Sequence, residues 1–238
     1  MKRLEIRKLL VCDDVEAREL FENDFTDEID ELSTLFADSL QYLEESDCAK
    51  DESKRAGIVS GYLHLAIESA VTATQLLSLG HIAPAGNSMR ISYESLCIAA
   101  LMRKNIKITV SNGKHEFDFY NDFMEKRSHA RADKVVALVL KNSKLLSISD
   151  KGCEFLKAAK DFYNGYSHAS HLFVHSKIKP STKQMYIGGG YDSEKKSDFK
   201  NQIKYIITYC KNIKTWVTFV GYNAPNKKIQ VTPTAHLN

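Results

Sequence analysis

The chain has 238 residues, 43% of them hydrophobic, and a formal net charge of +3. This length and composition allow one sizeable buried core and do not require a second domain. The apolar run behind the basic start is only Leu9 to Cys12, and no stretch approaches the roughly 20 apolar residues that cross a bilayer. We therefore expect a soluble, cytoplasmic protein without a secretory signal or a membrane partner.

Acidic residues concentrate at the start of the chain. Residues 1–53 carry 17 Asp and Glu against six Lys and Arg, whereas residues 54–238 carry 27 Lys and Arg against 13 Asp and Glu. This division fits an acidic segment lying on a basic body, or a basic surface that meets nucleic acid. Solvated faces of amphipathic helices account for it equally well.

Two helices are expected in the acidic segment. Helical spacing predicts the first over 2–22, and a break at 24–26 precedes a second helix that Thr26 can cap. The polar stretch 44–53 is then a connection, and we expect 1–53 to pack on the rest of the chain. The apolar positions of the second helix share one face, at Ile29, Leu32, Phe36, Leu40 and Leu43.

A helix suited to close packing is expected next, over about 54–79. Gly80 ends it, and Pro84 suits the first turn of a further helix that runs to about Lys104. The first of these two helices resembles the central helix of a bundle, because small residues permit close approach of its neighbours: Gly61, Ala66, Ser69, Ala70 and Ala73.

The middle of the chain is expected to hold shorter elements. Residues 105–114 form a loop with a short extended piece, and helices follow near 115–127 and 131–142. The junction between these two helices is a small, exposed basic turn made of Arg127, His129 and Arg131.

The last third is expected to be helical again. Asp150 can cap a long helix that continues through Phe173. A Gly-rich turn or small hairpin lies near 183–192, and its glycines are not a phosphate loop because no Gly-Lys-Ser/Thr follows. A final helix is expected over about 193–222. The sequence thus predicts an all-α bundle of about seven to eight helices.

Three parts follow from these elements. They are the acidic helical segment, a helical bundle over 54–222, and a C-terminal tail over 223–238. The five cysteines are widely spaced, which is typical of free core thiols in a reducing compartment. No pair of close cysteines begins a zinc cluster, so we expect neither a metal nor a cofactor.

Two polar stripes border the expected core. Arg90 and Glu94 are four residues apart and share one helix face. On the expected long helix, polar side chains recur every fourth residue, at Tyr163, Ser167, His171 and His175. Imidazole is the commonest proton-transfer group near neutral pH, and a guanidinium can hold a phosphate. The same groups could instead form a buried polar network that ties helices together, or a simple ion pair.

The run from Ala85 to Glu94 resembles an Arg-x-x-x-Glu helix of an uncharacterised family of bacterial helical-bundle proteins. That family also has a Tyr-x-x-x-Ser-x-x-x-His helix, matched here by Tyr163, Ser167 and His171. The family is distantly similar to HEPN domains, which include metal-independent ribonucleases of toxin and antiphage systems. Catalytic HEPN domains carry an Arg and a His on one helix segment with four to six residues between them, and no Arg of this chain has a His at that spacing.

This resemblance implies an RNA-cleaving or RNA-binding component of a bacterial defence or toxin–antitoxin system. Arg90 would replace the missing cation, with Glu94 beside it, and His171 would act as general acid or base on a 2′-hydroxyl. Tyr163, Ser167 and His175 would then position the RNA. The alternative is a non-catalytic helical module that binds another protein or forms a homodimer. It predicts internally satisfied polar stripes and an exposed apolar patch elsewhere.

Overall fold

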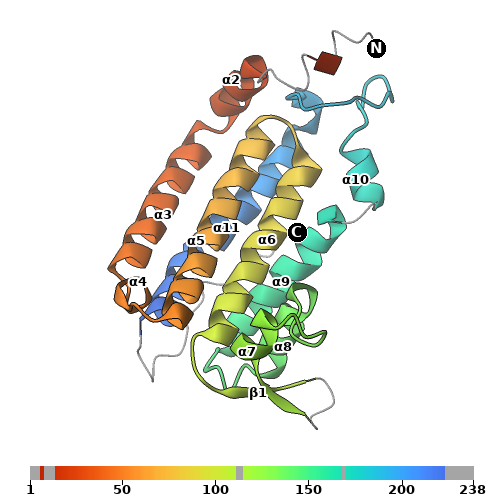
Figure 1. The fold of residues 1–238 in the computed structure, drawn as a ribbon. Helices are drawn as coiled ribbons and strands as arrows, with labels where there is room; N and C mark the ends of the chain where they lie inside the picture. Colours follow the sequence, from red (N-terminus) through yellow and green to blue (C-terminus); the bar gives the residue numbers. More distant parts are fainter. Residues whose placement is uncertain (1–5, 8–13, 111–114, 168–169, 223–238) are drawn as a thin grey trace.

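The structure is a computed structural model that describes residues 6–7, 14–110, 115–167 and 170–222. In this part of the chain the architecture is an all-α bundle with one short two-stranded sheet, which confirms the expected fold class (Figure 1). The expected tail over 223–238 lies outside the described residues.

The elements follow one another in two groups. The first group contains α2 (Val15–Asp24), α3 (Thr26–Glu45), α4 (Asp47–Lys50), α5 (Lys54–Ser78), α6 (Ile82–Met102), β1 (Lys107–Thr109), β2 (Glu116–Asp118) and α7 (Phe119–Met124). The second contains the 3₁₀ turn η1 (Ala132–Lys134), α8 (Val135–Lys141), α9 (Asp150–Ser167), α10 (His171–His175), the 3₁₀ turn η2 (Ser193–Lys195) and α11 (Lys196–Gly221).

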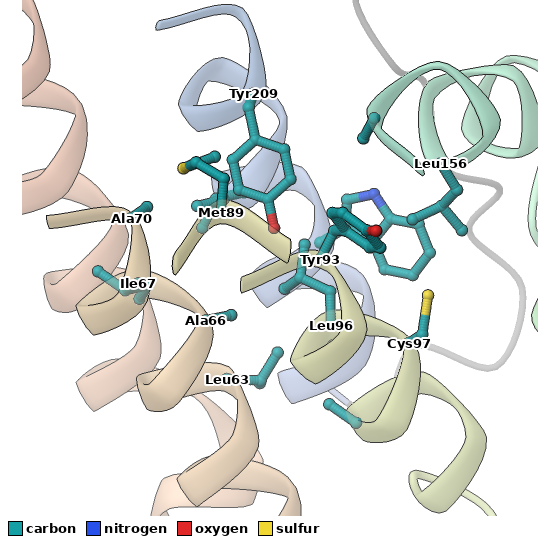
Figure 2. Close-up of a cluster of buried hydrophobic side chains, with 14 of the residues drawn as sticks. Leu63, Ala66, Ile67, Ala70, Met89, Tyr93, Leu96, Cys97, Leu156 and Tyr209 are labelled. Atoms are coloured by element: carbon teal, nitrogen blue, oxygen red, sulfur yellow. The ribbon is translucent and has the colours of Figure 1, made fainter. Parts of the chain in front are cut away.

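Helix α6 lies at the centre of the bundle. It packs against α5 over its whole length and also contacts α8, α9 and α11. Fifteen of its residues are buried, so it is apolar nearly all round, as a helix enclosed by others must be. Figure 2 shows the result: Tyr93 of α6 and Tyr209 of α11 lie in one cluster with Ile67 of α5 and Leu156 of α9.

The acidic helix α3 lies on α11 and α5. Across the contact with α11, Glu31 pairs with Lys211 at 2.7 Å and Asp38 with Lys214 at 3.1 Å. These side chains are 38–45% exposed, so each pair contributes at most about 1 kcal/mol. Burial of apolar residues such as Leu32 and Leu43 contributes more, at about 1.5–3 kcal/mol for each side chain.

The start of α3 differs from the expectation. Helix α2 ends at Asp24, and Phe25, not Thr26, is the residue before α3. The Thr26 hydroxyl donates backwards to the Glu22 carbonyl at 2.7 Å, so it caps the end of α2 and not the start of α3. Phe25 is fully buried, and its ring fixes the angle between the two helices.

A β-hairpin replaces the start of the helix expected over 115–127. Strands β1 and β2 pair antiparallel, with the buried Ile108 opposite Phe117. A side chain outside the hairpin holds it on the bundle: the Asn142 amide of the α8 end bonds the backbone of Thr109. The spacing of the apolar residues around Phe117 and Phe119 is compatible with a helix and with a strand. The contact of Asn142 with Thr109 stabilises the strand.

The long helix expected from Asp150 to Phe173 is interrupted. Helix α9 ends at Ser167, and Ser170 adopts an extended conformation (φ −88°, ψ 169°) and caps α10 by accepting from the Phe173 N–H. The Ser170 hydroxyl also contacts the Gly165 carbonyl. The serine favours this break because its side chain bonds to nearby backbone groups in non-helical conformations and so caps the next helix.

The Gly-rich segment forms a turn against the start of α6. A hairpin with a bridge between Ile178 and Met185 precedes it, slightly earlier than expected. The Gly190 N–H donates to the Leu79 carbonyl at 2.8 Å. Gly80 has a φ of +78°, and a Cβ there would lie 2.1 Å from the Gly190 carbonyl oxygen. Gly190 has a φ of +129°, so the backbone of both segments favours glycine at this crossing.

Candidate functional site

Arg90 and Glu94 lie at the edge of α6, beside residues that point into the core. The Arg90 Nε donates to Glu94 Oε1 at 2.8 Å, and the two side chains are 22% and 17% exposed. The hydrogen bond that Arg90 donates to Glu94 raises the pKa of Arg90 above its ordinary value. The pair is therefore largely buried, and it remains open to solvent on one side.

An open hollow of about 640 Å³ adjoins this pair. Its apolar part comes from α7 and the segment that follows: Phe123, Met124, Ala130 and Ala132. Its charged rim consists of Arg90, Glu94, Lys126, Arg131 and Asp133. No lining residue belongs to the acidic segment, so that segment, in the part that the structure describes, does not cover the hollow.

The rim between α7 and α8 is basic and well anchored. Between residues 126 and 134 the chain carries four Lys or Arg and one Asp. His129 Nε2 lies 2.6 Å from the Asp122 carboxylate, and the His129 ring packs edge-on against Phe117 at 4.4 Å between centroids. These contacts hold the turn, so Lys126 and Arg131 are presented from a fixed backbone.

Tyr163 is a core residue in the structure. It is 0% exposed, stacks on Tyr93 at 6.3 Å between ring centroids, and burial raises its pKa well above the ordinary value. Among the described residues its hydroxyl has no hydrogen-bond partner. Tyr163 therefore supports α6 from behind and does not line the hollow.

The histidines lie on a different element from the other predicted site residues. His171 and His175 are exposed on α10, which packs on the end of α9, with the Leu172 side chain beside Gly165. Ser167 is the last residue of α9, and its side chain lies outside the description. Because the helix breaks between Ser167 and His171, the expected four-residue stripe is not one helix face.

The structure thus brings together Arg90 and Glu94 and adds residues that the stripe argument missed. Phe123, Met124 and Lys126 complete the hollow. The basic turn over 127–131 was the signal in the sequence, because a cluster of cations is typical of an anion-facing surface. In the structure Arg127 pairs with Glu125 at 2.8 Å and the Arg131 Nε with Asp133 at 3.1 Å. What the sequence could not give is the contact of this turn with the middle of α6.

Comparisons with family models, with characterised proteins and with solved structures found no match to this chain. Within the described residues no three His, Cys, Asp or Glu side chains are grouped so that they could hold a metal ion. In the same residues, each helix is too short or too polar to cross a bilayer. The function must therefore be argued from the hollow itself.

Proposed function

We propose that this protein binds RNA, with one unpaired nucleotide in the hollow beside Arg90. The observation that carries the proposal is the combination of an apolar floor with a basic rim in a single open hollow. A base presents an apolar face that packs on aromatic and thioether side chains, and its phosphates seek cations. The hollow offers Phe123 and Met124 for the base, and Lys126 and Arg131 for the phosphates.

Size and chemistry both fit this ligand. A volume of about 640 Å³ lies within the roughly 300–1,000 Å³ of small-ligand sites. Met124 is 45% exposed although it is apolar, so a base that covered it would remove apolar surface from water. The resemblance of the Arg90–Glu94 helix to HEPN-like proteins favours the same class of ligand, and with it we propose a role in a defence or toxin–antitoxin system.

Binding is proposed here without cleavage at the described residues. The Arg90 Nε donates its hydrogen bond to Glu94, and Tyr163 is fully buried in the core. His171 and His175 belong to α10, and no histidine lines the hollow. Neither of these histidines therefore stands beside the proposed RNA site as the general acid or base.

Fluorescence anisotropy with a labelled single-stranded oligoribonucleotide tests the proposal. Lys126→Gln together with Arg131→Gln should weaken binding and lower the salt dependence, by about 0.7 in the slope of log K against log salt for each lost phosphate contact. Met124→Ala should weaken binding without changing that slope, because it removes an apolar contact. Gel analysis of the same samples reports whether the RNA stays intact.

The matched control is Lys200→Gln with Lys204→Gln, which removes two exposed cations from α11 and should leave binding unchanged. Equal loss in the control and the rim variant would mean that net charge alone drives binding. Absence of binding at low salt would contradict the proposal and leave the protein-interaction alternative. That alternative is favoured by exposed apolar side chains between 172 and 187, namely Leu172, Phe173, Val174, Met185 and Ile187.

A further inference from the structure

A second, smaller cavity lies at the opposite end of α5 from Gly80, where α5 begins and α6 and α11 end. Its volume is about 90 Å³, and two arginines, Arg55 and Arg103, line it together with Ser53 and Gly221. It shares no residue with the hollow beside Arg90. The cavity is far smaller than the hollow beside Arg90, which suits a small ion better than a nucleotide base.

Arg103 is a desolvated cation without a matching carboxylate among the described residues. Its Nη1 donates to the Phe219 carbonyl at 2.6 Å, and its guanidinium lies 3.9 Å above the centroid of the Phe219 ring. Burial lowers its pKa to about 10. A guanidinium has five N–H donors, and a half-buried charge that faces only one carbonyl and a ring is incompletely compensated.

Arg55 supplies a second guanidinium whose position is fixed. Its Nη2 pairs with Asp118 at 3.1 Å, its Nη1 donates to the Lys104 carbonyl at 3.0 Å, and it lies 4.4 Å from the centroid of the Tyr120 ring. Asp118 thus neutralises Arg55 from outside the cavity, which leaves the charge of Arg103 to be matched.

The acidic group on the cavity wall is already engaged. The Asp51 carboxylate accepts from the Ser53 N–H at 2.7 Å, and its pKa is lowered chiefly by that hydrogen bond. It lies just before the start of α5, and among the described residues the structure gives it no ion pair with Arg103. An incoming anion would face Arg103 on the other wall.

We propose that this cavity binds a tetrahedral oxyanion, either free phosphate or the terminal phosphate of a small phosphomonoester. Charge-assisted hydrogen bonds from Arg103 would compensate its desolvated charge, and the remaining N–H groups of Arg55 would add donors. Such a ligand would join the start of α5 to the ends of α6 and α11. This inference is independent of the RNA proposal, because it uses different residues.

Isothermal titration of the full chain with inorganic phosphate, against chloride at equal ionic strength, tests the inference. The wild-type protein should bind phosphate, and Arg103→Gln should weaken binding by about tenfold or more, since one charge-assisted contact is lost. Arg103→Lys keeps the charge but loses the planar fork, and it should bind with intermediate affinity. Arg131→Gln, in the other hollow, should bind phosphate as the wild type does.

Circular dichroism verifies that each variant is folded, and ³¹P line broadening provides a reading of binding that does not depend on heat. Tighter binding of glycerol 3-phosphate than of inorganic phosphate would identify a phosphomonoester as the ligand, and the reverse order would identify the free ion. Phosphate that gives no more heat or broadening than chloride would overturn the proposal. Equal binding by the folded Arg103→Gln variant would overturn it as well.

Discussion

Two buried tyrosines show how differently the same side chain can be accommodated in this core. Tyr209 shares a hydrogen bond of 2.9 Å with the Ser92 hydroxyl, which in turn donates to the Ala66 carbonyl of α5. Tyr163, on the other side of Tyr93, has no partner for its hydroxyl among the described residues. A buried hydroxyl without a partner costs about 1–3 kcal/mol.

Tyr163→Phe is therefore expected to leave the free energy of unfolding unchanged or to raise it by about 1 kcal/mol. Tyr209→Phe is the matched comparison and should lower it by about 1 kcal/mol, because the Ser92 hydroxyl loses a partner. Urea unfolding followed by circular dichroism measures both. A marked loss of stability in Tyr163→Phe would show that its hydroxyl has a partner after all.

At the scale of single residues, the spacing of Arg90 and Glu94 predicted that they share one helix face. It could not predict which tyrosines are buried. Tyr163 lies at the edge of an apolar stripe, and whether such a residue faces the core or the solvent depends on the neighbouring helix. Here Tyr93 and Tyr205 enclose its ring. The exposure of His171 likewise depends on a helix break and not on spacing.

Among the elements, the contact between α6 and α9 depends most on one glycine. A Cβ at Gly86 would lie 2.4 Å from the Cβ of Tyr166, which real structures do not tolerate. Gly57, in the first turns of α5, has nothing within 4 Å of the same position. The first glycine permits close helix packing, and the second only adds flexibility to the unfolded chain.

Gly86→Ala should lower the free energy of unfolding by about 1–3 kcal/mol, because α9 must move away from α6. Gly57→Ala should raise it by about 0.5–1 kcal/mol, since alanine favours helix and meets no obstacle. Thermal and urea denaturation of the two variants beside the wild type are the measurements. If both substitutions stabilise, the close approach of the two helices is not as the structure has it.

The element boundaries that the sequence predicts well are those of helices with a regular buried face. Periodicity predicted α5, α6 and α11 to within a few residues, because each buries a regular apolar face and ends at a strong signal such as Gly80. The β1–β2 hairpin and the gap between α9 and α10 were missed. Both rest on local side-chain bonds, from Asn142 and Ser170, which compete with the helical pattern only once the bundle has formed.

For the whole molecule, the division of charge along the chain leads to contacts between the acidic first segment and residues of α11. Asp24, at the end of α2, accepts from the Lys196 ammonium at 2.6 Å and from the Tyr191 hydroxyl. These two hydrogen bonds lower the pKa of Asp24 below its ordinary value of 3.8. The carboxylate is therefore held in its charged form in the folded state.

The sign of the pH dependence follows. A carboxyl whose folded pKa is depressed stabilises the fold above its unfolded pKa, and that contribution disappears as the pH falls through the folded value. Asp24→Asn should therefore be less stable than the wild type at neutral pH, and the difference should shrink as the pH is lowered below 3.8. Urea unfolding across this pH range gives the test. A difference that does not change with pH would mean that packing, and not charge, accounts for the role of Asp24.

The hollow could not be predicted from the sequence, because it forms where the turn near residue 130 packs beside the middle of α6. No periodic signal encodes that packing. Helix α3 contacts α5 and α11, and complementary charge and an apolar face on α3 both favour this contact.

The enclosure of α6 has a practical consequence for the search for ligands. Arg90 belongs to the helix that α5, α7, α8, α9 and α11 all contact, so a molecule bound there is coupled to cooperative unfolding of the core. A ligand present at one hundred times its dissociation constant would add about 2.7 kcal/mol to the free energy of unfolding. A melting-temperature screen of nucleotides and short oligomers can thus find the natural occupant without any assay of activity.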